Sequence, residues 1–156
     1  MLSEKQKILN DLDSARARLQ VALNQLDARA EIYSPWHVKE LLDHIAGWDD
    51  SVIAALRSHA EGDVPAITAP RGIDAYNEQT VSTRETLPLE RTQQEFRVTR
   101  EILKQVILDL PDAKFVQPLV LPWGSTGTVS QIVEVFVEHE HEHAHDLEKL
   151  IADQRA

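Results

Sequence analysis

The helical spacing of its apolar residues is the feature that most restricts the fold of this chain. Near the N-terminus, apolar side chains recur every three or four positions, at Ile8, Leu12, Ala15, Leu19 and Ala22. This spacing produces one apolar stripe along an α-helix. The chain has only five glycines and little of the alternation of apolar and polar residues that marks a β-strand. These patterns predict an all-α fold.

Four long helices and one shorter helix are expected from the same reasoning. Ser3 is a plausible N-cap for the first helix. Ser34 and Pro35 are expected to open the second, with Ser34 as its cap and Pro35 in its first turn. Thr128 and Gln131 fit a capping box before the last helix. The predicted helices cover residues 5–26, 35–60, 73–85, 89–110 and 128–153.

These helices predict a four-helix bundle with long connecting loops. Residues 64–72 contain two prolines and are expected to form a loop. Residues 113–127 are expected to form an irregular connection with a short extended piece. A length of 156 residues favours a single domain over residues 1–156.

Composition narrows the classes of function. The chain has no cysteine, so a metal site must use His, Asp or Glu. Its formal charge of −10 would repel phosphate backbones, which argues against nucleic acid as a partner. No apolar run approaches the ~20 residues that span a bilayer, so no membrane partner is expected. The charged N-terminal segment does not have the pattern of a signal peptide, and we expect a cytoplasmic protein.

Four of the seven histidines lie in the segment VEHEHEHAHDLEKL. At about 100° per residue, His139 and His143 continue the apolar stripe of the last helix, whereas His141 and His145 fall on the opposite side. His139 and His143 are one turn apart, which brings two imidazoles within reach of one ion. The pair is therefore a candidate metal site that lacks a third ligand.

The second predicted helix offers His44 as that third ligand. His44 shares an apolar face with Leu41 and Trp48, and this face is expected to point inward. His37 lies on the same face, but roughly 10 Å away along the axis, too far for the same ion. His37, His59, His141 and His145 are expected to be solvated or hydrogen-bonded surface groups.

Two motifs resemble those of the DinB/YfiT-like four-helix bundles. The first is Trp36-x-Val38-Lys39-x-Leu41-Leu42-x-His44-Ile45-x-x-Trp48, and the second is His139-x-x-Glu142-His143-Ala144-x-Asp146-Leu147. The H-x-x-E-H form of the second motif resembles the ClbS/DfsB branch. Tyr76-Asn77 and Leu121-Pro122-Trp123-Gly124 support that branch.

The resemblance implies a divalent metal held by His44, His139 and His143. Imidazole ligands suit zinc, nickel, iron or copper, and we expect a divalent ion such as zinc, nickel or iron. The resemblance also implies a homodimer, and metal-dependent hydrolysis or thiol transfer in stress or detoxification.

Other residues have both a functional and a structural interpretation. Glu142 and Asp146 can act as a catalytic base or orient the ligands, or form salt bridges along the helix. Trp48, Tyr76 and Trp123 can line a substrate cleft, or belong to the core.

Three functions remain open from the sequence. The first is a metal-dependent hydrolase or thiol transferase that acts on a small electrophilic molecule. The second is a module that binds or sequesters a small molecule without turnover, with the metal incidental. The third is a dimer whose histidines make its association depend on pH.

Overall fold

A computed structural model describes residues 1–155 of the chain. Over these residues the structure is built from α-helices with two small β-hairpins, which confirms the predicted all-α class. The helices are α1 Leu2–Asn24, α2 Val38–Ala60, α3 Ile73–Ser82, α4 Leu89–Asp109, α5 Asp112–Val116 and α6 Val129–Arg155. The strands are β1 Glu31–Tyr33, β2 Trp36–His37, β3 Leu119–Val120 and β4 Thr126–Gly127. None of the described helices is both long enough and apolar enough to span a membrane.

The chain divides into two compact units. The first combines residues 1–41 with the chain from Ser130 onward, and the second is Leu42–Val129. The prediction of a single domain stays a prediction.

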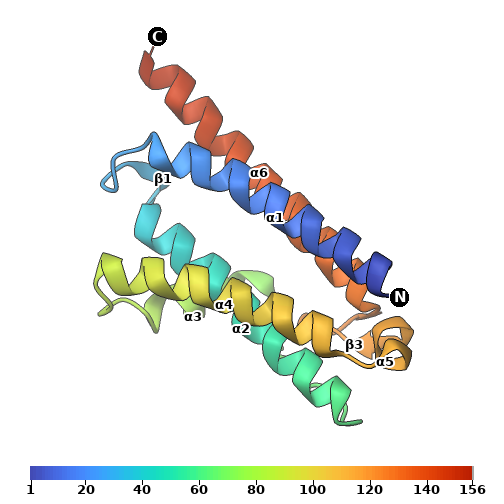
Figure 1. Cartoon of the computed structure of the whole chain (residues 1–156). Helices are drawn as coiled ribbons and strands as arrows, with labels where there is room; N and C mark the ends of the chain where they lie inside the picture. The colour runs from blue at the N-terminus through green and yellow to red at the C-terminus, as the bar shows by residue number, and fades with distance from the viewer. Residues whose placement is uncertain (156) are drawn as a thin grey trace. The chain divides into compact units, whose positions relative to one another are not determined.

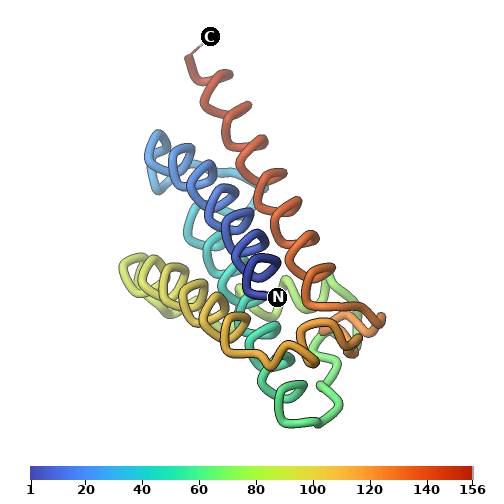
Figure 2. The backbone as a smooth tube through the Cα atoms, turned by 45° about the vertical axis from the view of Figure 1, so that its right-hand side comes forward, coloured from blue at the N-terminus to red at the C-terminus, as the bar shows by residue number. Residues whose placement is uncertain are grey.

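In the first unit, α1 and α6 run side by side (Figures 1 and 2). Arg16 in α1 bonds Glu140 in α6, and Gln25 near the end of α1 bonds Arg155. The later residue of α1 pairs with the later residue of α6, so the two helices run parallel. The predicted apolar stripe of α1 is buried, and so is the stripe of α6; their buried members include Ile8, Leu12, Ala15, Leu19, Ala22, Ile132, Phe136, Ala144 and Leu147.

The connection from α1 to α2 differs from the prediction. Ser34 and Pro35 do not open a helix but form the turn of a hairpin between β1 and β2, with a cis peptide bond between them. The Ser34 hydroxyl donates to the carboxylate of Glu31 and caps no helix. Helix α2 begins three residues after Pro35, at Val38. Local propensity for a helix start therefore yields here to strand pairing.

In the second unit, polar bonds between buried side chains join α2 to α4. Thr92 of α4 donates to Asp43 of α2 at 2.8 Å, and Arg100 of α4 donates to both carboxylate oxygens of Asp49 at 2.9 and 3.1 Å. A Cβ on Gly47 would lie 2.5 Å from Cγ2 of Thr80, so this glycine permits the close approach of α2 and α3.

The remaining boundaries are mostly as predicted. The expected loop 64–72 lies outside any helix or strand, α4 matches its predicted range, and α6 extends to Arg155. The extended piece expected in residues 113–127 is the hairpin of β3 and β4, but the short helix α5 was not predicted. Ser3 is not an N-cap, because α1 already begins at Leu2. Helix α3 ends at Ser82, before the predicted Glu85.

Candidate metal centre

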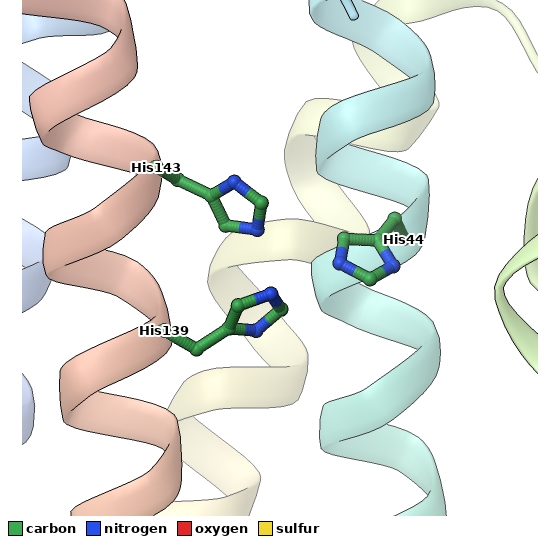
Figure 3. Close-up of side chains that lie close together, drawn as sticks. All are labelled: His44, His139 and His143. Carbon is green, nitrogen blue, oxygen red and sulfur yellow. The ribbon is translucent and has the colours of Figure 1, made fainter. Parts of the chain in front are cut away.

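Three imidazoles from two helices form the candidate site. His44 belongs to α2, and His139 and His143 project from successive turns of α6 (Figure 3). One potential ligand nitrogen from each ring lies within 4.8 Å of the other two. The same three residues were selected from their positions on helix faces, and the structure brings them together.

The surroundings keep the α6 imidazoles uncharged near neutral pH. Burial and, to a smaller extent, the neighbouring His139 ring together lower the pKa of His143 to about 4, and the charges of Asp146 and Glu140 oppose this only in part. Burial also lowers the pKa of His139, against the opposing charges of Glu142 and Glu140. A neutral imidazole has a lone pair to donate to a metal, whereas an imidazolium has none. The rings are therefore in the protonation state that metal binding requires.

Tyr33 of β1 fixes the far side of His143. Its hydroxyl lies 2.9 Å from Nδ1 of His143 and also bonds the carboxylate of Asp146. The His143 ring also packs against the Tyr33 ring, with centroids 5.6 Å apart, and against the His139 ring, with centroids 4.3 Å apart. Burial and the negative charge of Asp146 raise the pKa of Tyr33, so its hydroxyl stays protonated.

Glu142 and Asp146 are both exposed side chains of α6. The observed partner of Asp146 is the Tyr33 hydroxyl, not Lys149. Asp146 thus contacts the ligand set through a tyrosine, in line with the ligand-orienting interpretation. Glu142 follows His139 by three residues, and its charge raises the pKa of that ring.

The three predicted substrate-binding aromatics meet within the second unit. The Trp48 ring packs edge-on against Tyr76 at 4.6 Å and against Trp123 at 6.1 Å between centroids. Trp48 itself is buried and donates from Nε1 to Oδ1 of Asn77 at 2.6 Å, and the Tyr76 hydroxyl donates to the Gly47 carbonyl. Tyr76 and Trp123 remain partly exposed. This aromatic cluster has a buried centre and two accessible members.

A family model for the DinB superfamily matches residues 11–147. The chain belongs to the DinB superfamily. No curated protein sequence matches the chain.

Two solved structures show that the DinB fold extends over nearly the whole chain. A mycothiol-dependent maleylpyruvate isomerase matches with a TM-score of 0.77 and 14% identity, over 92% of this chain and 60% of the isomerase. YfiT from Bacillus subtilis, described as a probable metal-dependent hydrolase with an unusual four-helix bundle topology, matches with a TM-score of 0.71 and 16% identity, over 97% of this chain and 88% of YfiT. The likeness confirms the predicted four-helix bundle. This chain spans about 60% of the isomerase's length.

The other four histidines lie outside the cluster of His44, His139 and His143. His141 is 3.1 Å from a guanidinium nitrogen of Arg18, His145 is exposed, and His37 is 3.5 Å from the Glu40 carboxylate. These positions agree with the predicted solvated or hydrogen-bonded surface roles. His59 was also predicted to be a surface group, which is wrong, because it is 3% exposed and donates to the Lys114 carbonyl at 2.8 Å.

Sequence reasoning missed two residues of the site. Tyr33 lies 110 positions before His143, in a hairpin that the sequence did not predict. Glu140 was overlooked because alternation of glutamate and histidine resembles a solvated surface, yet it is 2% exposed. A charge placed on the apolar stripe next to His139 is the signal that indicates its burial.

Proposed function

We propose that this DinB-family protein binds a divalent metal ion through His44, His139 and His143 and uses it to transform a small electrophilic molecule. The observation that supports this most directly is the convergence of one ligand atom from each of three imidazoles within 4.8 Å. Three protein ligands leave positions open for small molecules, which is the pattern of catalytic rather than structural zinc sites.

The residues present fit such an ion. A zinc–nitrogen bond is about 2.1 Å long, so two ligand nitrogens on one ion are at most ~4.2 Å apart. From a separation within 4.8 Å, ring adjustments of less than ~1 Å suffice. Nitrogen ligands suit zinc, nickel or iron. A bound divalent ion would supply Lewis acidity, which makes a water molecule or a thiol nucleophilic near neutral pH.

Two carboxylates of α6, Glu142 and Asp146, have different proposed roles. We assign Glu142 as the base that accepts the proton of the nucleophile, because it is an accessible carboxylate three residues from His139. Asp146 contacts His143 only through the Tyr33 hydroxyl, so of the two predicted catalytic carboxylates we assign Asp146 the positioning role.

The aromatic cluster is the proposed contact surface for the substrate. Trp48 follows His44 by one helical turn on α2, so the cluster begins next to a ligand on the same helix. Tyr76 and Trp123 offer partly exposed rings on either side of Trp48. Such rings favour a small, largely apolar molecule.

The reaction class and the branch of the family are also part of this proposal. One structural neighbour is a mycothiol-dependent isomerase and the other is described as a probable metal-dependent hydrolase, so these neighbours support a thiol nucleophile and hydrolysis, respectively. The H-x-x-E-H motif and the Tyr76-Asn77 and Leu121–Gly124 segments favour the ClbS/DfsB branch. A homodimer is proposed on the resemblance alone, and the cytoplasmic location stays a prediction from the sequence.

Elemental analysis of untagged protein tests the metal. We expect about one metal ion per chain in the wild type and in His145→Ala, which removes an exposed histidine of the same helix. We expect none in His139→Ala, with an unchanged helical circular dichroism spectrum. A folded His139→Ala protein that keeps metal would overturn the site.

Turnover assays separate the two leading functions. Metal-loaded protein is incubated with an activated ester, and with an aryl halide plus a low-molecular-weight thiol. Product in excess of protein that requires His139 supports an enzyme. Metal bound without turnover, together with one-to-one capture of an aromatic probe by the wild type that Trp123→Ala loses, would instead support the sequestering module.

A further inference from the structure

We propose that Tyr33 is a positioning residue that relays Asp146 to His143 and thereby fixes which nitrogen of His143 presents a lone pair to the metal. This inference rests on the proposed metal site. It adds a residue from β1, outside the helices that provide the ligands, and gives Asp146 a defined partner.

The direction of each hydrogen bond follows from the protons available. Tyr33 has one hydroxyl proton, and the carboxylate of Asp146 can only accept, so that proton points to Asp146. The Tyr33 oxygen is then an acceptor toward Nδ1 of His143, 2.9 Å away. Nδ1 must therefore carry the ring proton of the neutral imidazole.

The tautomer follows from this chain of bonds. A neutral imidazole has one N–H, so a proton on Nδ1 leaves Nε2 with a lone pair. Nε2 is thus the nitrogen through which His143 can bind an ion. Metal-bound histidines commonly donate their other N–H to an acceptor that fixes the ring and raises its basicity. Here the acceptor is a tyrosine oxygen whose own proton is drawn toward a carboxylate.

The position of Tyr33 also restricts the His143 ring. The tyrosine and histidine rings are tilted by 59°, and His139 packs on the His143 ring at 4.3 Å. A ring bonded at Nδ1 and packed against two neighbours cannot flip to exchange its nitrogens without breaking the hydrogen bond. Tyr33 therefore selects both the tautomer and the orientation.

The test compares Tyr33→Phe with Ser34→Ala. Each removes one hydroxyl from the same hairpin, but the Ser34 hydroxyl donates to the Glu31 carboxylate, outside the ligand set. Zinc affinity is measured by competition with a chelating dye. We expect Tyr33→Phe to bind zinc 10- to 100-fold more weakly and Ser34→Ala to bind within about twofold of the wild type.

Nitrogen NMR of the metal-free protein gives a second readout. Long-range ¹H–¹⁵N correlations report which ring nitrogen of His143 is protonated. We expect the Nδ1–H tautomer in the wild type and in Ser34→Ala, and loss of that preference in Tyr33→Phe.

The two readouts separate the inference from the proposed function. A wild type that binds no zinc but shows the Tyr33-dependent Nδ1–H tautomer would overturn the metal site and support the relay. A wild type that binds zinc with His143 as the Nε2–H tautomer in the metal-free state, or a Tyr33→Phe protein with unchanged tautomer and affinity, would overturn the relay.

Discussion

The guanidinium of Arg16 in α1 holds the carboxylate of Glu140 in α6, with Nη2 2.8 Å from Oε1 and Nε 3.3 Å from both oxygens. The Glu140 side chain is 3% exposed and that of Arg16 is 15% exposed. Because Glu140 directly follows His139, the ion pair anchors to α1 the turn of α6 from which His139 projects.

Replacing Arg16 with Met should therefore strongly destabilise the fold. It removes the guanidinium that lies 2.8 Å from a buried carboxylate, and we expect a loss of about 2–4 kcal/mol in the free energy of unfolding, slightly less than for a fully buried pair. Urea denaturation measures this loss. Arg18→Met is the matched control, because Arg18 and Glu148 are 37% and 44% exposed, and about 1 kcal/mol or less should be lost. Equal losses in the two variants would contradict a larger stabilisation by the buried pair than by the exposed one.

Acid should destabilise the metal-free protein through His143. Its pKa is about 4 when folded, against an ordinary value of 6.5. Between these pH values the unfolded chain binds a proton that the folded chain does not, so stability falls as the pH falls through this window. The slope from this residue is at most about 1.4 kcal/mol per pH unit. His139, whose pKa is also lowered, acts in the same direction.

Comparison with a variant isolates this contribution from that of the carboxylates. Unfolding free energies between pH 7 and 4.5 should depend less on pH in His143→Gln than in the wild type. His145→Gln, which alters an exposed histidine on the same helix, should keep the wild-type slope. Identical slopes in His143→Gln and the wild type would contradict the lowered pKa.

Metal removal should lower the melting temperature. An ion that binds only the folded state adds about 2.7 kcal/mol of stability at a free concentration 100 times its dissociation constant. A chelator should therefore lower the melting temperature of the wild type and leave that of His143→Ala unchanged. Differential scanning calorimetry with and without added zinc measures both shifts. A chelator effect of equal size in the two proteins would place the bound metal elsewhere.

Gly47→Ala should destabilise the protein, although alanine is the better helix former by about 1 kcal/mol. The added Cβ would lie 2.5 Å from Cγ2 and 2.6 Å from Cβ of Thr80, so α2 and α3 must separate. We expect a net loss of about 1–2 kcal/mol in urea denaturation, since overpacking typically costs ~1–3 kcal/mol. A stabilised Gly47→Ala protein would mean that α3 moves away from α2 at little energetic cost.

The sequence predicted the helices and the cluster of three histidines because both depend on helical periodicity. Counting at about 100° per residue placed His139, His143 and His44 on apolar faces, and these faces are where the structure has them. The family motif selected the same residues. Periodicity carries no information about Tyr33, whose contact with His143 depends on how the hairpin of β1 and β2 folds back.

Failures of the sequence analysis cluster where tertiary contacts override local preference. Ser34-Pro35 has the chemistry of a helix start, but pairing of β1 with β2 places it in a turn. His59 near the end of α2 resembles a solvated helix terminus, but the chain after α4 returns and offers it the Lys114 carbonyl. In both cases the deciding partner lies in a segment that local reasoning cannot position.

The parallel pairing of α1 with α6 has a consequence for the order of events during synthesis. Arg16 leaves the ribosome more than a hundred residues before Glu140, the partner that it needs. The first helix must therefore wait, with its apolar stripe uncovered, until the residues of α6 have been made. Nascent chains stalled before α6 would expose that stripe to chaperones.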